Sequence, residues 1–260
     1  MNIFLRIHII FCNLGFNLIN FLNIIYLPRY LQNYIEFKKK TNLASENFFF
    51  LPILGEHKKT SGNLVKYYFY QDLLVASYIF KNKPKKHVDV GSRIDGFVAH
   101  VASYRKIEVF DIRSNSFQFN NIIFKKKNFN KIEKSLTNYC DSLSCLHTLE
   151  HIGLGRYGEA IDVNGHIKVL FNLSKILKPN GKLYLSYPIS NISKVYFNSE
   201  RVFNHLEILD WLNNSNLKLK LVNFDFIDDN ENVYLNSNLE NYRLKKIKYG
   251  CGIYTLKKIF

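Results

Sequence analysis

The stretch HVDVGSRIDGF, residues 87–97, runs from a short apolar segment into a glycine-containing turn. An apolar, β-branched run of this length is typical of a buried parallel strand, and the residues after it favour a helix. Gly91 has no Cβ, so a ligand can approach the turn closely, and Gly96 lets the helix begin tightly. The stretch therefore predicts a strand–turn–helix unit at the carboxyl edge of a sheet, where open α/β sheets bind their ligands.

Strands and helices alternate along the rest of the chain. Beyond the first strand at 87–91, apolar runs predict strands at 106–111, 121–124, 141–147, 182–189, 217–227 and 251–259, with helices at 64–80, 95–104, 162–181 and 205–212. This order indicates a parallel sheet with helices on both faces. Only a short turn-like stretch, 230–243, separates the last two strands, so the final strand can run antiparallel. We therefore expect an α/β fold with a Rossmann-like, seven-stranded, mostly parallel sheet.

Residues 1–62 differ from the rest and predict a helical N-terminal extension before a domain over 63–260. The first 31 residues are largely apolar, but Arg6, His8 and several asparagines interrupt them, and no small-residue cleavage site follows. A membrane-spanning helix needs about 20 largely apolar residues. We expect an amphipathic helix that packs or lies at an interface, which leaves peripheral membrane contact open.

The net charge of +15 raises the question of an anionic partner. The lysines fall in short scattered runs, at 38–40, 58–59, 125–127 and 245–246, and no arginine-and-aromatic recognition module accompanies them. This pattern favours a solvated surface over nucleic-acid binding. The four cysteines form no CxxC pair and no metal-ligand spacing, which predicts reduced thiols in a cytoplasmic protein and no metal site.

Asp111 follows Gly91 by twenty residues and ends the second predicted strand. A carboxylate at that place can accept hydrogen bonds from the hydroxyls of a ribose. Backbone N–H groups at the start of the helix favour an anionic or carboxylate-bearing ligand. Each residue alone is explained by a tight turn or a helix cap, but together they favour ligand binding. The nicotinamide fingerprint G-x-G-x-x-G is not present, because Arg93 occupies its middle glycine position, which argues against a nicotinamide-dependent oxidoreductase.

The segment HTLEH, residues 147–151, matches H-x-x-E-H, the pattern of inverted zinc proteases. On a helix, His147 and His151 would share a face beside Glu150. The segment follows a buried strand, and no acidic third ligand is evident in a matching helix, so zinc hydrolysis is disfavoured. The other alternative is that both histidines cap and pack the helix.

Several strings resemble the family catalogued as domain of unknown function 268, a divergent branch of the class I methyltransferases. They are HVDVGSRIDGFVAH, FDIRS, LHTLEHIGLGRYGEAID, LKPNGKLYLSYPI and VYFNSERVFN, spread over about residues 64–210. The resemblance implies a seven-stranded sheet with S-adenosylmethionine as cofactor. Methyltransferases of class I carry an acidic-x-G-x-G-x-G turn, which this chain begins correctly before Arg93 and Asp95 replace the later glycines.

Site residues follow from the same resemblance. It implies that Asp89, Gly91, Ser92 and Gly96 line the methionine side of the cofactor, with Arg93 in the same turn. Asp111 would hold the ribose. Asn128 stands where such enzymes place an acidic residue for the adenine amino group. Many of them also carry a string similar to LHTLEH at the end of the fourth strand, beside the methyl donor and the substrate.

The expected reaction is methyl transfer to a small-molecule or glycan acceptor. Transfer to oxygen or nitrogen often needs a base, and either histidine of the HTLEH segment can serve, because imidazole titrates near neutral pH. Arg156, Tyr157 and Arg201 follow in predicted loops at the same edge of the sheet, where they can hold an anionic or hydroxyl-rich acceptor. The alternative is a binding or scaffold protein that keeps this fold without catalysis.

Overall fold

The computed structural model describes residues 11, 12, 15, 22–40, 49–55, 66–115, 119–129, 133–213 and 217–260. The chain forms two compact units, residues 1–64 and 65–260. Most of the amphipathic helix expected over residues 1–31 lies outside the described residues. Within the described part of the chain, every helix is too short or too polar to cross a bilayer.

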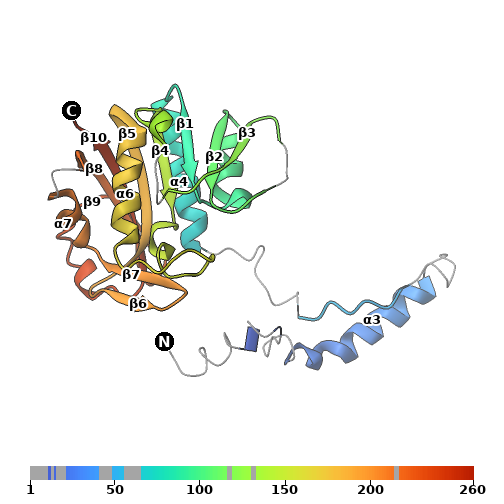
Figure 1. Ribbon diagram of the computed structural model, residues 1–260. Helices are drawn as coiled ribbons and strands as arrows, with labels where there is room; N and C mark the ends of the chain where they lie inside the picture. Colours follow the sequence, from blue (N-terminus) through green and yellow to red (C-terminus); the bar gives the residue numbers. More distant parts are fainter. Residues whose placement is uncertain are drawn as a thin grey trace. The chain divides into compact units, whose positions relative to one another are not determined.

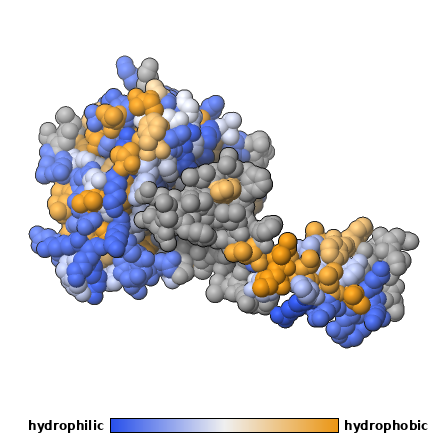
Figure 2. Space-filling view, turned by 90° about the horizontal axis from the view of Figure 1, so that it is seen from below, coloured by the Kyte–Doolittle hydropathy of each residue, from blue (hydrophilic) through white to orange (hydrophobic). Residues whose placement is uncertain are grey.

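The first unit contains the short turn η1 (Asn23–Tyr26) and the helix α3 (Leu27–Lys40). The Tyr30 ring meets the Phe50 ring edge-on with centroids 5.1 Å apart, and the Tyr30 hydroxyl accepts a hydrogen bond from the backbone N–H of Leu51. No described residue of α3 is buried. Figure 2 shows apolar side chains gathered on one side of this unit and hydrophilic ones on the other. The helix is therefore amphipathic.

Seven strands of the second unit form the sheet that the sequence predicts (Figure 1). Their order is β3-β2-β1-β4-β5-β10-β8, and β10 runs antiparallel to both β5 and β8. The fold is thus an α/β Rossmann-like, mostly parallel sheet, as predicted, with the antiparallel strand last in the chain. The bounds are β1 (His87–Val90), β2 (Ile107–Asp111), β3 (Ile122–Lys126), β4 (Cys140–Leu146), β5 (Leu177–Ser190), β8 (Leu219–Ile227) and β10 (Gly250–Lys258).

Three further strands extend this sheet to ten in the described chain. β9 (Val233–Ser237) pairs with β8 at the edge, within the stretch that the sequence predicts as a turn. β6 (Lys194–Tyr196) and β7 (Glu200–Asn204) form a hairpin, and β7 also pairs with the end of β5. These strands have only three to five residues each, too few for an apolar period to stand out in the sequence.

Helices cover both faces of the sheet. α4 (Lys66–Asn82), the π-helical turn η4 (Ile94–Val98) and α5 (Ala99–Ala102) bury apolar side chains such as Ile79 and Phe97 in one core cluster. On the opposite face, α6 (Gly165–Ile176) and α7 (Glu207–Asn213) bury Leu170 and Trp211 in a second cluster. In Figure 1, α6 lies in front of the sheet and α4 behind it. The short turns are η5 (Lys134–Leu136), η6 (Leu149–His151) and η7 (Leu244–Lys246).

Candidate functional site

The glycine turn after β1 brings three chain segments together. Gly91 has φ +72°, a conformation that side chains with a Cβ rarely adopt, and its N–H donates to the carbonyl oxygen of Phe110 at 2.9 Å. A Cβ at Gly91 would lie 2.6 Å from the Thr148 side chain. The turn therefore needs glycine for its backbone conformation and for the close approach of the HTLEH segment.

Asp89 stabilises this turn through buried hydrogen bonds. Its buried carboxylate accepts hydrogen bonds from the N–H of Ser92 at 3.1 Å, the hydroxyl of Ser92 at 2.6 Å and the hydroxyl of Ser144 at 2.5 Å. Burial raises the pKa of Asp89 to about 6, although these hydrogen bonds act in the opposite direction. The structure thus places Asp89 beneath the turn, where it fixes the path of the backbone, and not on the wall of either cavity described below.

Gly96 lets the turn pack closely against α4. It has φ −117° and ψ −106° within η4, and a Cβ there would lie 2.4 Å from the Asp72 carboxylate of α4. Arg93, the residue that replaces the second glycine, points outward and forks onto Asp95, with Nη2–Oδ2 at 2.9 Å and Nε–Oδ1 at 3.2 Å. The Arg93 side chain is 54% exposed and forms part of the wall of the second cavity described below.

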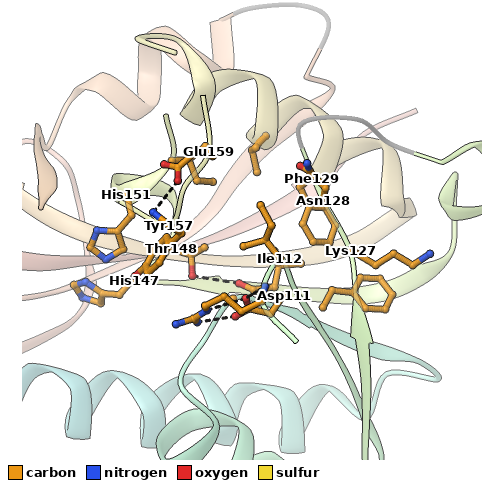
Figure 3. A pocket seen from close by; sticks show the side chains of 16 residues that line it. Asp111, Ile112, Lys127, Asn128, Phe129, His147, Thr148, His151, Tyr157 and Glu159 are labelled. Atoms are coloured by element: carbon orange, nitrogen blue, oxygen red, sulfur yellow. Dashed lines mark hydrogen bonds and ion pairs between the residues drawn. The ribbon is translucent and has the colours of Figure 1, made fainter. Parts of the chain in front are cut away.

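The first cavity, which we call the donor cavity, lies at the carboxyl ends of β1, β2 and β4 (Figure 3). The space in this cleft is about 690 Å³, including the open solvent at its mouth. In Figure 3, His147 and His151 lie at one end and Asn128 and Phe129 at the other, with Asp111 between them. Its walls include Val90, Gly91, Phe110, Asp111, Ile112, Arg113, Lys127, Asn128, Phe129, His147, Thr148, His151, Ile152, Tyr157, Glu159 and Val169.

Asp111 ends β2 inside the donor cavity, where the sequence predicts it. Its carboxylate accepts hydrogen bonds from the backbone N–H of Arg113 at 2.8 Å, from Nε of the same residue at 3.0 Å and from Nη2 at 2.7 Å. The Asp111 side chain is 11% exposed and that of Arg113 is 58% exposed. The carboxylate that would hold a ribose is therefore paired with an arginine that can swing into solvent.

A second cavity of about 650 Å³ adjoins the first, and the two share Gly91, Arg113, His147, His151 and Tyr157. The other residues on its walls come from α4, the glycine turn, the end of β4 and the loop after η6. They are Tyr68, Gln71, Asp72, Ser92, Arg93, Leu146 and Arg156. A ligand that fills both cavities would pass the glycine turn at Gly91.

The HTLEH segment is not the helix that a zinc protease would need. His147 has φ +47°, and only Leu149–His151 form a single 3₁₀ turn. The expectation that the two histidines share a helix face is therefore wrong, because the chain turns sharply directly after β4. Among the described residues, no group of three or more His, Cys, Asp and Glu side chains is placed to hold a metal ion. None of the four cysteines forms a disulfide.

His147 and Glu150 form a buried pair instead. His147 Nδ1 lies 2.8 Å from Glu150 Oε1, and the two side chains are 4% and 0% exposed. Burial opposes the charged imidazolium, but Glu150 and the nearby Cys251 side chain outweigh it and raise the pKa of His147 to about 10. The Tyr68 ring lies 4.6 Å from the His147 ring. The pairing with Glu150 thus favours the protonated imidazole, which has no lone pair with which to act as a base.

His151 has a different environment. Its Nδ1 lies 2.7 Å from the backbone carbonyl oxygen of Ser199, which can only accept, so Nδ1 carries a proton; its Nε2 lies 3.9 Å from Glu150 Oε1. Arg156 Nη1 donates to the same carbonyl at 3.0 Å, and the Arg156 guanidinium lies over the Tyr157 ring. His151 and Tyr157 line both cavities, and Arg156 lines the second.

Arg201 lies away from both cavities. It extends from β7, is 7% exposed and donates to backbone carbonyls in the loop after β4, most closely to that of Ile152 at 2.6 Å. It also reaches the carbonyls of Glu150, Asp162 and Val163, each at 3.4 Å. Arg201 therefore holds the loop that carries His151 and Tyr157, and does not face a ligand itself.

Three features of the site were not predicted from the sequence. The first turns of α4 supply Tyr68, Gln71 and Asp72 to the second cavity, although the sequence marks this helix only as a packing element. Arg113 follows Asp111 by two residues, a spacing that allows the bidentate pair and was a usable signal. Phe129 forms part of the wall opposite Ile112 and carries no motif that marks it.

Comparison with solved structures identifies the fold. The 1,6-didemethyltoxoflavin-N1-methyltransferase of Burkholderia thailandensis, solved with S-adenosylhomocysteine, matches with a TM-score of 0.51 at 11% identity, over 74% of this chain and 80% of that chain. The N-methyltransferase NodS of Bradyrhizobium japonicum WM9 has a TM-score of 0.51 at 10% identity, over 75% and 89%. Coclaurine N-methyltransferase has a TM-score of 0.51 at 10% identity, over 72% and 70%. At these identities the likeness shows the fold alone.

Sequence comparison gives a family without a known activity. A search of curated proteins finds no match. Residues 99–243, more than half of the chain, match the family described as Caenorhabditis protein of unknown function, DUF268. The chain therefore belongs to the DUF268 family, and its fold is that of the S-adenosylmethionine-dependent methyltransferases.

Proposed function

We propose that the domain over residues 63–260 binds S-adenosylmethionine and transfers its methyl group to a small-molecule or glycan acceptor. The observation that carries this proposal is the donor cavity, in which Gly91, Asp111 and Asn128 line one continuous cleft at the carboxyl ends of the parallel strands. When bound there, the cofactor supplies an electrophilic methyl group. The chain's own residues would bind the two substrates, align them and accept a proton.

The walls of the donor cavity suit a nucleoside with an amino-acid tail. Gly91 lies on the walls of both cavities, so the tail would pass along the backbone of the turn there. Asp111 offers a carboxylate for the ribose hydroxyls once Arg113 has turned away. Ile112 and Phe129 provide apolar surface for a base. Asn128, at the same end of the cleft, has an amide that can pair with the edge of an adenine.

His151 is the base that we propose for an acceptor hydroxyl or amine. Its Nδ1 is fixed by the carbonyl of Ser199, so the basic Nε2 belongs to a ring of defined orientation on the wall shared by the two cavities. His147 would instead hold a negative or partly negative oxygen of the acceptor, because its pairing with Glu150 keeps it protonated. Glu150 would act through His147, and Arg201 would position the loop.

A non-catalytic binding or scaffold protein is the alternative, and one observation favours it. The bidentate pair between Arg113 and Asp111 gives that carboxylate a partner without any ribose. In a scaffold this pair would be permanent and the cleft would take no nucleoside. The two proposals therefore differ in whether the donor binds at all.

Titration calorimetry with S-adenosylmethionine and S-adenosylhomocysteine tests the proposal. The wild-type protein should bind both with one site per chain. Asp111→Asn should weaken binding about 10- to 100-fold, the loss expected for charge-assisted hydrogen bonds of about 1.5–3 kcal/mol. Asp210→Asn changes an exposed carboxylate of α7 outside the cavities and should leave binding unchanged. Absence of binding by the folded wild-type protein would support the scaffold.

Location and partners form part of the same proposal. The free thiols support a reducing, cytoplasmic location, since disulfides are rare there. The amphipathic helix α3, with Ile35 and Phe37 more than half exposed beside a lysine run at its end, supports peripheral contact with a membrane. Scattered lysines give no support to nucleic acid as a partner.

A further inference from the structure

The charges around the second cavity point to one class of acceptor. The side chains on its walls include three arginines, namely Arg93, Arg113 and Arg156, together with the cationic His147. The one carboxyl group among these wall residues is Asp72, whose pKa is raised by burial and which accepts a hydrogen bond from Gln71. The wall thus carries four basic side chains beside one carboxyl group.

The three arginines differ in whether a carboxylate pairs with them. Arg93 is paired with Asp95, and Arg113 with Asp111. Arg156 has no carboxylate partner within the part of the chain that the structure describes, and its Nη1 donates to the Ser199 carbonyl. A guanidinium has five N–H donors in a planar fork that matches an oxyanion. Arg156 can therefore donate its remaining N–H groups to a ligand.

Aromatic rings hold these guanidinium groups at the cavity. The Arg93 guanidinium carbon lies 5.6 Å from the Tyr68 ring centroid. Tyr157 contacts two of the arginines, with Arg113 at 5.0 Å and Arg156 at 5.5 Å from its ring centroid. Stacking on a ring limits the freedom of a long side chain, so less entropy is lost when it binds a ligand.

We propose that the second cavity binds the acceptor through an oxyanion group, such as a phosphate or carboxylate, with Arg156 as its main anchor. The proposal rests on the function proposed above, because it assigns this cavity to the methyl acceptor. Arg113 links the two cavities: a ribose that takes Asp111 releases this guanidinium beside Arg156. The oxyanion would then lie between them, with His147 at the base of the cavity.

The test uses phenyl phosphate as probe and the full-length protein saturated with S-adenosylhomocysteine. Titration calorimetry should show binding of phenyl phosphate and at least tenfold weaker binding of benzyl alcohol, which has the ring without the charge. Arg156→Gln should weaken phenyl phosphate binding about 10- to 100-fold. Arg156→Lys keeps the charge but loses the fork, and should weaken it several-fold.

Arg243→Gln is the matched control, since Arg243 is exposed, stacks on Tyr242 and lies outside both cavities. Its binding of the probe should equal that of the wild type. Equal loss in Arg156→Gln and Arg243→Gln would overturn the proposal, because it would trace the binding to the net charge of +15. Equal affinities of the wild-type protein for phenyl phosphate and benzyl alcohol would also overturn the proposal. If S-adenosylhomocysteine binds but phenyl phosphate does not, this inference alone fails; if neither binds, the proposed function fails with it.

Discussion

Arg113 forms a bidentate pair with Asp111 on the wall of the donor cavity, with Nη2 2.7 Å from Oδ2 and Nε 3.0 Å from Oδ1. In the proposed complex, a ribose hydroxyl would compete with this arginine for the carboxylate. The pair is largely solvent-exposed on the arginine side, and exposed pairs contribute about 0.2–1 kcal/mol. Donor binding therefore competes with a weak internal contact.

Removal of the competing arginine should tighten donor binding. We expect Arg113→Gln to lower the dissociation constant of S-adenosylhomocysteine by about two- to fivefold, as follows from the free energy of an exposed pair. Titration calorimetry measures the change, with Arg243→Gln as the control. Weaker binding in Arg113→Gln would show that the arginine contacts the donor and does not compete with it.

Gly91→Ala should damage both the turn and the cleft. The φ of +72° costs a residue with a Cβ about 1–2 kcal/mol, and the new methyl group would press on Thr148. We expect a loss of about 2–4 kcal/mol in the free energy of unfolding and at least tenfold weaker donor binding. Gly158→Ala is a control with positive φ but open space around its Cβ. It should lose stability only; equal donor affinities in the two variants would contradict the account.

The pair of His147 and Glu150 predicts a pH dependence of stability. The pKa of His147 in the folded protein, about 10, lies above its ordinary value of 6.5 in an unfolded chain. The stabilisation is therefore complete below about pH 6.5 and is lost as the pH rises from there through about 10. Urea unfolding between pH 6 and 10 measures this loss.

Substitution of the carboxylate should abolish that dependence. In Glu150→Gln, the pKa of His147 should fall below 7 because burial then dominates, and the free energy of unfolding should drop by about 3–5 kcal/mol. Ring resonances of His147 in an NMR titration report the pKa directly. A His147 pKa that stays near 6.5 in the wild-type protein would contradict the pairing.

Arg201 should matter for the loop and not for acceptor contact. Arg201→Lys keeps the charge but cannot reach four carbonyls, so we expect a loss of about 2–4 kcal/mol in the free energy of unfolding. Once the variant is saturated with donor, its affinity for phenyl phosphate should fall less than twofold. A tenfold loss of that affinity with unchanged stability would place Arg201 at the acceptor.

The positions of the seven main strands along the chain were predictable because each buried strand is a short apolar run between breakers. The run at 87–91 and its glycine turn define the carboxyl edge, and Asp111 follows at the end of the next strand. The same logic predicts that the last strand, β10, runs antiparallel. The edge strand β9 and the hairpin of β6 and β7 were missed, since strands of three to five residues give no clear apolar period.

The candidate site was predictable in position but not in the role of each residue. Asp89 and Gly96 belong to the turn but act beneath it, because the hydrogen bonds of Ser144 and the approach of Asp72 come from distant parts of the chain. The conformation of His147 could not be predicted either. Its positive φ ends the strand and turns HTLEH away from a helix, and a periodicity argument assumes regular backbone.

A crystal structure of the complex with S-adenosylhomocysteine tests the central claim most directly. We expect the amino-acid tail at Gly91, the ribose hydroxyls on Asp111 and the adenine between Ile112 and Phe129, with Arg113 turned away from the carboxylate and towards Arg156. A complex crystal soaked at saturating ligand in which the Arg113–Asp111 pair persists and the cleft holds no nucleoside would contradict the account.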